Sequence, residues 1–529
     1  MPCPPSRINT YSIKAPPAQD GRFLANLWDT LQPLFDQHKP DPAHINKPLL
    51  DKFPEKDNLG SFFNLTNEEA ENTRATHMEL LRKLPPYPQG HFGGRGVVVL
   101  AGGRYSEFAA TSIGMLRASG SKLPVEVWLN DDGDEAWCSE LPPEGMVCRR
   151  LTDYMSLDDL PHPYQWKVFA MLYSTFEDIL FIDADSIPVK NLDFLFDSAV
   201  YKHHGVILWP DYWKHTGSPL LPYLIGINST RQSDILASET SIESGQLVWN
   251  KKTHWKSLVL AAYYNYFGPD FWYTIFNNGW QGWGDKDTFP AALKAAQQDY
   301  YQVSHEILAA YYNYFGPDFW YTIFNNGWQG WGDKDTFPAA LKAAQQDYYQ
   351  VSHEIVTIFV QGTSDGIGML QPDPTNNAEH KPLFLHMNMI KWSTRELLCS
   401  ENCNKIKGQG DNPFHMIDEK SKINKHLREG MRTLAVGQLF QGNIDPEPDM
   451  WRVVEHNACR TSWASRHMCR NARRHLERTF GFEFTQYRNE NNEGGNAHTQ
   501  LCIEGPWARP SRAKPKPKNW AKDYEEMYE

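Results

Sequence analysis

The feature that most constrains the fold of this chain is an alternation of apolar strands and amphipathic helices that begins near residue 95. A β-branched run, Val97–Leu100, ends in Gly102 and Gly103. The segment YSEFAATSIGMLRASGS has apolar residues at helical spacing, and VEVWLNDD predicts the next strand. Strand, helix and strand with short connections form a βαβ unit, which requires a parallel pairing of the two strands. The sequence therefore predicts an α/β domain.

Later segments extend this pattern. The helix YQWKVFAMLYSTF leads into the strand DILFI, and GVILWPDYW and PLFLHMNMIKW predict further strands. The stretch ESGQLVWNKKTHWKSLVLAAYYNYF predicts a short connector followed by a long amphipathic helix. We predict four regions: a stem or lead-in (1–92), a catalytic domain (93–395), a C-terminal extension (396–505) and a disordered tail (506–529).

Composition narrows the classes of function. The 529 residues carry a net charge of −12 and no basic stripe, which excludes nucleic-acid binding. No run of 18 apolar residues is present, and the first residues lack the apolar segment of a signal peptide, so the chain reads as soluble. The eight cysteines and the sequons at Asn64 and Asn228 fit a secretory lumen equally well. For the cysteines after the main domain, disulfides are favoured over a zinc site, because their spacing matches no regular zinc motif.

Chemistry is concentrated in the stretch FIDADSIP. An apolar strand ends in Asp183 and Asp185, and alternation places both carboxylates on one side, at the carboxyl edge of the sheet. Two close carboxylates repel each other unless a cation lies between them, and oxygen ligands suit Mn²⁺ or Mg²⁺. The alternative is an acidic pair that caps a turn.

Two enzyme classes use such a pair. In haloacid-dehalogenase-like phosphatases it lies on the first strand, whereas in GT-A glycosyltransferases it lies partway through the domain and holds the metal that binds a nucleotide-sugar. At least two predicted strands precede Asp183. This position favours a transferase.

The chain resembles the fungal Golgi α-1,2-mannosyltransferases that add branches to outer-chain mannan. The resemblance covers residues 97 to about 392 and is carried by AGGRYSEFAATSIGMLR, GSKLPVEVWL, FEDILFIDADSIP, GVILWPDYW, ESGQLVWNKKTHW, GDKDTF, YYQV and FLHMNMIKW. It implies a GT-A fold, a Rossmann-like mixed sheet flanked by helices. It also implies GDP-mannose as donor, Mn²⁺, an α-mannoside acceptor of N-glycans or mannan, and retention at the anomeric carbon.

The same resemblance assigns roles to single residues. GT-A enzymes often complete the metal shell with a late histidine, so His386 is expected either to join Asp183 and Asp185 as a ligand or to be structural. The donor site is expected to include the backbone at Gly102 and Gly103, the cations of Lys167 and Lys391, and the ring of Trp209. Glu243, expected at the head of a helical segment, either accepts a hydrogen bond from a sugar hydroxyl or caps the helix.

Residues 260–307 are repeated without change as residues 308–355. Each copy ends its aromatic stretch in NGWQGWGDKD, whose Gly, Trp and Asp residues suit a sugar-binding loop; the carboxylates are Asp285 and Asp287 in the first copy and Asp333 and Asp335 in the second. Two identical units are too few for a solenoid, which needs at least three. The duplication is either very recent or an error in the assembly or annotation of the gene. A real duplication leaves one copy surplus, and for that case we predict poor solubility or swapped dimers of the full chain.

The sequence thus predicts a metal-dependent retaining mannosyltransferase. The alternatives are a transferase that uses a UDP-sugar, an inactive nucleotide-sugar-binding partner and, last, a phosphatase. The resemblance places the protein in the Golgi lumen or membrane through an anchor that we do not find in this chain. Self-association is compatible with the sequence.

Overall fold

The computed structural model describes residues 21–40, 65–129, 138, 145–214, 218, 220–227, 240–277, 285–298, 301–302, 356–359, 366–375, 382–387, 446–460 and 466–482.

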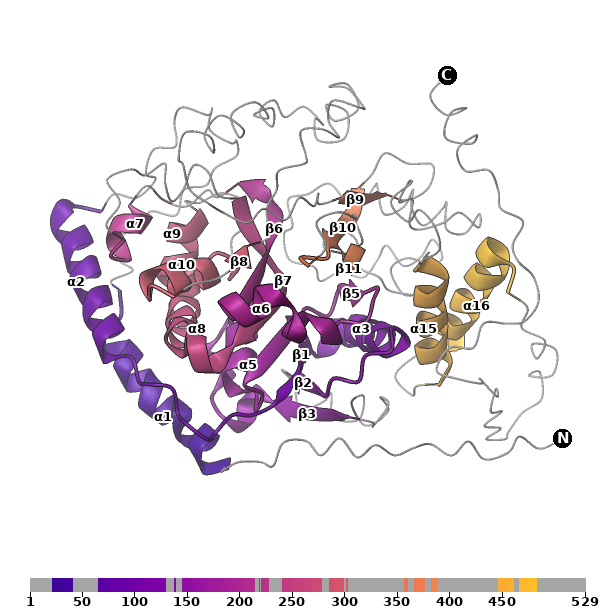
Figure 1. Cartoon of the computed structure of the whole chain (residues 1–529), viewed down its shortest axis with the longest axis horizontal. Helices are drawn as coiled ribbons and strands as arrows, with labels where there is room; N and C mark the ends of the chain where they lie inside the picture. Colours follow the sequence, from indigo (N-terminus) through magenta and orange to yellow (C-terminus); the bar gives the residue numbers. More distant parts are fainter. Residues whose placement is uncertain are drawn as a thin grey trace, which may run out of the picture.

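A seven-stranded mixed sheet lies at the centre of the molecule (Figure 1). In spatial order its strands are β3 (Met146–Arg150), β2 (Val125–Leu129), β1 (Arg95–Ala101), β4 (Asp178–Ile182), β7 (Thr240–Asn250), β6 (Val206–Lys214) and β8 (Tyr301–Gln302). The first four strands pair in parallel, and β7 is antiparallel to both of its neighbours. This confirms the predicted α/β class, with a mixed sheet flanked by helices.

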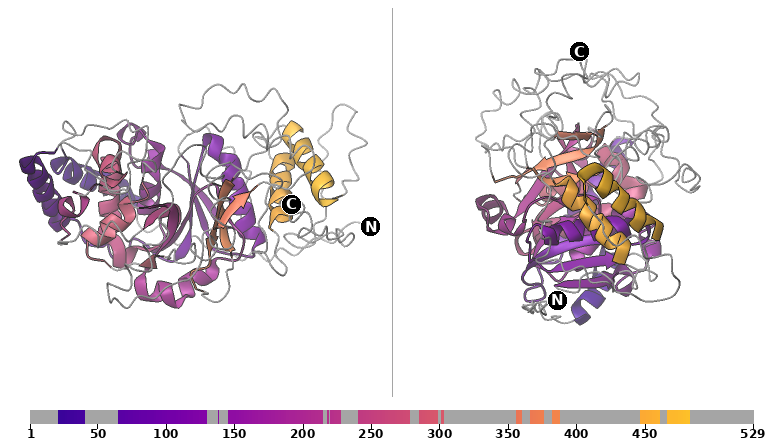
Figure 2. Two further views of the ribbon diagram at one scale, coloured as in Figure 1. Left: turned by 90° about the horizontal axis from the view of Figure 1, so that it is seen from above. Right: turned by 90° about the vertical axis from the view of Figure 1, so that its right-hand side faces the viewer.

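Helices cover both faces of this sheet (Figures 1 and 2). The described helices, of which α3, α5, α6 and α8 contact sheet strands, are α1 (Gly21–Gln37), α2 (Asn67–Lys83), α3 (Ser106–Ala118), α5 (Pro163–Tyr173), α6 (Ala199–His204), α7 (Leu221–Leu224), α8 (Lys251–Tyr266), α9 (Tyr273–Asn277), α10 (Thr288–Ala295), α15 (Glu447–Arg460) and α16 (Arg466–Phe480). Shorter turns are η2 (Gly103–Tyr105), η4 (Leu151–Asp153), η5 (Leu157–Asp159), η6 (Asp193–Asp197) and the π-helical η8 (Gly268–Trp272).

The apolar runs of the central strands are explained by burial on both faces. Along β1, Val97 and Val99 belong to the core beneath α3, whereas Val98 belongs to the core beneath α5 and α8. The same alternation holds on β4, where Leu180 and Phe181 enter opposite cores. Because neither face meets water, the strands read as continuous apolar runs.

The predicted connector before α8 is a central strand. Residues 240–250 form β7, which pairs with β4 on one side and β6 on the other. Leu247 and Val248 enter opposite cores, as a doubly buried strand requires. The prediction that Glu243 heads a helix is therefore wrong, since helix α8 begins at Lys251.

A second, four-stranded sheet lies beside the main one. It has the order β5 (Ser186–Pro188), β11 (Pro382–His386), β10 (Gly366–Pro372) and β9 (Val356–Phe359), and every pairing is antiparallel. Strand β5 follows β4 after a single turn, and the Ser112 hydroxyl of α3 donates to the Ser186 carbonyl at 2.8 Å. The small sheet thereby joins a late part of the chain to the end of β4.

The predicted lead-in contributes to the core of the domain. Helix α1 buries Leu31 and Phe35, and the Phe35 ring meets the Tyr263 ring of α8 edge-on at 5.6 Å. The Tyr263 hydroxyl donates to the His38 carbonyl at 2.7 Å. The described part of residues 1–92 is therefore packed on the domain. The predicted boundaries of the four regions of the chain stay predictions.

The C-terminal extension contains a disulfide-linked helix pair. Cys459 and Cys469 join α15 to α16, in agreement with the preference for disulfides; Cys399, Cys403 and Cys502 lie outside the described residues. A second disulfide joins Cys138 to Cys148. Helix α15 lies against α3, where a Cβ on Gly114 would stand 2.4 Å from Val453 Cγ1.

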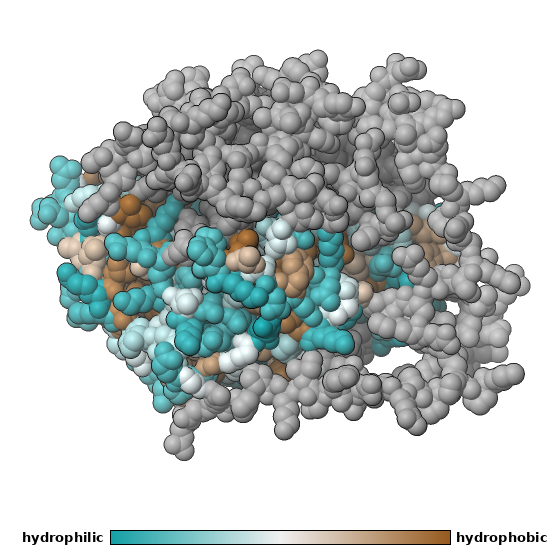
Figure 3. Space-filling model, in the orientation of Figure 1, coloured by the Kyte–Doolittle hydropathy of each residue, from teal (hydrophilic) through white to brown (hydrophobic). Residues whose placement is uncertain are grey.

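The surface of the described residues in this view is mostly polar. Figure 3 shows hydrophilic residues over most of the coloured surface, with apolar ones scattered among them. Large hydrophobic side chains that are more than a third exposed in the described part are Val147, Tyr164 and Tyr223. None of the helices that the structure describes combines the length and apolarity needed to cross a bilayer.

The described residues of the duplicated stretch all belong to the first copy. They form the second half of α8, then η8, α9 and α10, and they end at β8, which pairs with β6. Their aromatic side chains are buried: Tyr264, Trp272 and Tyr273 are each fully inaccessible. Residues 308–355, including Asp333 and Asp335, lie outside the described residues.

We therefore expect one copy to suffice for folding. Joining Ile307 to Val356 removes an insertion whose closure costs on the order of 3 kcal/mol, so the free energy of unfolding should stay the same or rise. Denaturant unfolding and light scattering measure this, with a stable monomer expected for the single-copy chain. Deleting both copies is the control and should abolish folding; a single-copy chain that unfolds more easily than the full chain would contradict the expectation.

A buried histidine under α2 makes stability depend on pH. His77 is fully buried, its Nε2 lies 2.7 Å from the Tyr264 hydroxyl, and its ring stacks on the Tyr264 ring. Burial, followed by the nearby charge of Arg74, lowers the pKa of His77 to about 3. Between pH 6.5 and about 3, this imidazole is therefore neutral in the folded protein but protonated in the unfolded chain.

The sign of the effect follows from this shift. The contribution of neutral His77 to the free energy of unfolding is fully present above the unfolded pKa of 6.5, and it is lost as the pH falls toward 3. At pH 5 the loss should reach about 2 kcal/mol. Denaturant unfolding at pH 7.5 and pH 5 should show a steeper loss for wild type than for His77→Gln; parallel losses would exclude the effect.

Candidate active site

Three potential metal ligands converge at the carboxyl edge of β4. Asp183 and Asp185 follow the last residue of this strand, and His386 ends β11. One ligand atom from each lies within 4.8 Å of the others. The small sheet places the histidine: His386 pairs with Ser186, and the Met387 amide donates to the Asp185 carbonyl at 3.0 Å.

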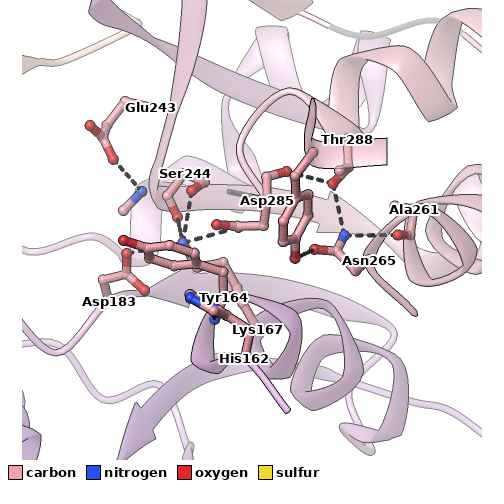
Figure 4. Close-up of polar contacts among 12 residues, drawn as sticks. His162, Tyr164, Lys167, Asp183, Glu243, Ser244, Ala261, Asn265, Asp285 and Thr288 are labelled. Carbon is pink, nitrogen blue, oxygen red and sulfur yellow. Dashed lines mark hydrogen bonds and ion pairs between the residues drawn. The ribbon is translucent and has the colours of Figure 1, made fainter. Parts of the chain in front are cut away.

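Lys167 lies beneath this group and connects it to two other segments. From α5 its ammonium contacts Asp183 Oδ2 at 3.0 Å and Asp285 Oδ2 at 3.3 Å. It also donates to the carbonyl and hydroxyl of Ser244 on β7, at 2.9 and 2.8 Å (Figure 4). Lys167, predicted to neutralise a phosphate, is thus buried among protein oxygens.

On the other side of the group, His386 lies between two carboxylates. Its Nε2 is 3.5 Å from Asp185 Oδ1, and its Nδ1 is 3.3 Å from Glu243 Oε1. Glu243 also accepts a hydrogen bond from the Gly245 amide at 2.7 Å. The structure therefore places Glu243 beside the metal-type ligands.

Burial and charge act against each other on these groups. Burial raises the pKa of Asp183 and of Asp285, while the Lys167 ammonium acts to lower both. Burial alone would lower the pKa of Lys167, but the carboxylates of Asp183 and Asp285 raise it above its usual range. Similarly, burial is outweighed at His386, where the Glu243 carboxylate raises the pKa of the imidazole.

The chemistry of the cluster suits a divalent cation. The carboxylates of Asp183, Asp185, Glu243 and Asp285 gather in a largely buried site, where each contacts Lys167 or His386. Two carboxylates and an imidazole are ligands that suit Mn²⁺, so the donor set of Asp183, Asp185 and His386 fits a divalent metal.

The first copy of the duplicated stretch holds its carboxylates through a buried polar network. Asp285 and Asp287 are both buried and immediately precede α10. The Thr288 hydroxyl donates to the Asp285 carbonyl, Asn265 donates to that hydroxyl at 2.8 Å, and Tyr273 donates to Asn265 at 2.6 Å (Figure 4). This network fixes the Asp285 backbone next to Lys167.

Other predicted site residues have different surroundings. Gly102 and Gly103 follow β1 with φ of 129° and 54°, a backbone that favours glycine. Trp209 is fully buried and donates its indole N–H to the Pro372 carbonyl at 3.1 Å, so neither ring face is open to a base or sugar. Lys391 lies outside the described residues.

The sequence alone does not reveal several neighbours of the cluster. Ser244 lies in the segment predicted to be a connector, but it is part of β7 and accepts hydrogen bonds from Lys167 through two oxygens. His162 caps the start of α5 and Tyr164 lies in its first turn, with ring centroids 4.6 Å apart. Burial lowers the pKa of His162, and the Asp285 carboxylate acts in the opposite direction. The Tyr164 side chain is 46% exposed at the edge of the site. The stretch HPYQ, a helix start one turn before Lys167, was the available signal.

The fold and the cluster define an α/β domain with a divalent-metal donor set at the carboxyl edge of its sheet. A model of a mannosyltransferase family, Mannosyl_trans3, matches residues 94–239, 228–309 and 304–371. These matches span more than half of the sequence, and the chain belongs to this mannosyltransferase family.

Several similar proteins are named as α-1,2-mannosyltransferases. The chain is 35% identical to α-1,2-mannosyltransferase MNN24 of Candida albicans over 289 residues, which are 47% of this chain and 41% of the relative. It is 33% identical to MNN23 of the same organism over 335 residues (53% and 55%). It is 32% identical to MNN5 of Saccharomyces cerevisiae S288c over 305 residues (47% and 52%). The chain thus spans about half the length of the curated relatives it matches.

Similar solved structures include the galactosyltransferase LgtC, with a TM-score of 0.28 and 12% identity, covering 40% of this chain and 74% of that one. Mouse xyloside xylosyltransferase 1 has a TM-score of 0.28 and 13% identity, covering 42% and 91%. The fold class of this chain rests on its own mixed sheet.

Removing the buried ammonium should destabilise the domain strongly. In Lys167→Met, Asp183 and Asp285 lose their shared cation in a buried position, and the free energy of unfolding should fall by about 3–5 kcal/mol. Denaturant unfolding in the presence of chelator measures the loss. The double variant Lys167→Met/Asp285→Asn should recover part of it, because one buried charge is removed. A single variant as stable as wild type would refute this role of Lys167.

Proposed function

We propose that this protein is a metal-dependent, retaining α-mannosyltransferase that transfers mannose from GDP-mannose to an α-mannoside acceptor of N-glycans or cell-wall mannan. Membership of the mannosyltransferase family supports the transferred sugar. Metal dependence is supported by the convergence of Asp183, Asp185 and His386 at the carboxyl edge of the sheet, where one ligand atom from each lies within 4.8 Å of the others. Ligands of open α/β sheets bind at this edge.

The proposed metal would be Mn²⁺ or Mg²⁺, held by Asp183, Asp185 and His386. When bound, it supplies positive charge that stabilises the diphosphate leaving group. Lys167 holds the Asp183 carboxylate from below through a 3.0 Å contact, so that this ligand is positioned before any substrate arrives.

The remaining residues bind and orient the substrates in this proposal. The glycine turn at Gly102 and Gly103 leaves room for the nucleotide, and Lys391 contacts the diphosphate. Asp285 and Asp287 accept hydrogen bonds from sugar hydroxyls and orient them. The polar network that begins at Thr288 keeps Asp285 in place.

In the proposed reaction no side chain of the protein acts as a nucleophile. The bond between mannose C1 and the phosphate oxygen breaks, and a bond from C1 to the acceptor oxygen forms on the same face. The proton of the acceptor hydroxyl passes to the leaving phosphate oxygen. The protein contributes orientation of the two substrates and stabilisation of the leaving group.

Location in the Golgi is part of the proposal and follows from the same family resemblance. Glycan acceptors of this kind are met in the secretory pathway, and the two disulfides of the described part, Cys138–Cys148 and Cys459–Cys469, are compatible with an oxidising lumen.

The test is mannose transfer from GDP-mannose to a short α-mannoside with Mn²⁺, by the full chain and by the chain lacking residues 308–355. We expect transfer that chelator abolishes and added Mn²⁺ restores. Asp185→Ala should lose activity by orders of magnitude, whereas Asp197→Ala, an exposed acid paired with Arg95 at 3.1 Å, should not.

Other outcomes would replace the proposal. Transfer only from a UDP-sugar would change the donor, and GDP-mannose binding without transfer would indicate an inactive binding partner. Transfer that is insensitive to chelator and to Asp185→Ala would remove the metal from the mechanism.

A further inference from the structure

Glu243 faces the imidazole of His386 from the side opposite to the other metal-type ligands. The Glu243 Oε1 atom lies 3.3 Å from His386 Nδ1, whereas His386 Nε2 lies 3.5 Å from Asp185 Oδ1. Both Glu243 and His386 are buried. The two ring nitrogens therefore have separate neighbours, one on strand β7 and one after strand β4.

The glutamate is held in this direction by its own strand. Its Oε1 atom accepts the Gly245 amide at 2.7 Å, and the Gly245 carbonyl accepts the Asp183 amide at 2.8 Å. The carboxylate that faces His386 and the backbone of the first aspartate are thus fixed by the same residue. A shift of Gly245 would move both.

Gly245 also leaves the space in which the two side chains meet. A Cβ at this position would stand 2.9 Å from His386 Cε1, 3.0 Å from its Nδ1 and 3.1 Å from Glu243 Oε1. All three separations are closer than side chains normally pack, and the neighbours are a buried ring and a buried carboxylate. Glycine at this position is required by the Glu243–His386 contact.

The chemistry of the pair selects one tautomer of the imidazole. A carboxylate can only accept hydrogen bonds, so a neutral imidazole beside it carries its proton on Nδ1 and leaves the lone pair on Nε2. The lone pair then faces Asp185. His386 Nδ1 is a buried nitrogen that lacks an aligned hydrogen-bond partner among the described residues, and the Glu243 oxygen at 3.3 Å is in position to become that partner.

We propose that Glu243 is a positioning residue that fixes the ring and tautomer of His386, so that Nε2 is presented as a metal ligand. This inference rests on the metal site of the proposed function. Metal-bound histidines characteristically donate their second N–H to a carboxylate, and loss of that partner costs about 10- to 100-fold in metal affinity. Glu243 is thereby assigned to the metal site and not to a sugar hydroxyl or a helix cap.

The experiment measures Mn²⁺ binding directly, without substrate or turnover. The full-length protein is titrated with Mn²⁺, free ion is followed by electron paramagnetic resonance, and pulsed measurements at saturation report nitrogen coordinated to the bound ion. Wild type should show the nitrogen signal, and His386→Ala should lack it. Glu243→Gln should bind Mn²⁺ about 10- to 100-fold more weakly, with a reduced nitrogen signal.

Two further variants separate positioning from a general loss of structure. Gly245→Ala keeps the glutamate but pushes on the His386 ring, and it should lower Mn²⁺ affinity in the same direction. Glu177→Gln is the matched control: this glutamate accepts from the Tyr87 hydroxyl at 2.7 Å outside the cluster, and its loss should leave Mn²⁺ affinity unchanged. Thermal unfolding in chelator identifies any variant that fails to fold.

The outcomes distinguish this inference from the proposed function. Wild-type affinity and an intact nitrogen signal in Glu243→Gln or Gly245→Ala would overturn the positioning role and leave the metal site standing. A wild-type protein that binds no Mn²⁺ would overturn both. Weakened binding in both variants, with the control unchanged, would support the role of Glu243.

Discussion

The ammonium group of Lys167 is the contact on which the arrangement of the site depends. It meets Asp183 after β4, Ser244 on β7 and Asp285 before α10, so one charge on α5 holds three other segments. A buried ammonium is tolerated only where oxygens surround it. The position of α5 on the sheet therefore determines where the carboxylates of these segments lie. The geometry of the site depends in this way on the packing of one helix.

The direction of strand β7 brings a further acid to this gathering point. Asp183 and Asp285 share Lys167 as a partner, and β7 adds Glu243 beside His386. Because β7 runs antiparallel between β4 and β6, its first residues, not its last, reach the carboxyl edge of β4. The antiparallel strand thus brings ESG to the aspartate pair, which the parallel strands alone would not do.

The sequence predicted the parts of the fold that are buried on both faces and missed the part that faces the site. Strands β1 and β4 are continuous apolar runs, and Asp183 and Asp185 follow directly from the end of one. Strand β7 contains Glu243, Ser244 and Gly245 in its first half. These residues are polar or small because they contribute to the cluster, and they interrupt the apolar pattern that would predict a strand. The partners of Glu243 and Lys167 are distant in sequence, so no local spacing reveals them. A tryptophan such as Trp209 can stack on a ligand or fill a core. Its packing decides between the two roles, and Trp209 is a core residue.

The β5–β11 pairing has a consequence for the order in which the protein matures. It joins residues that follow β4 to His386, a connection of high sequence separation that forms late in folding. During synthesis the sheet strands up to β7 emerge from the ribosome long before β11, so Asp183 and Asp185 are made without their histidine. A nascent chain consequently holds an incomplete set of ligands. The proposed metal site therefore has all three of its ligands only after the chain has been made as far as His386.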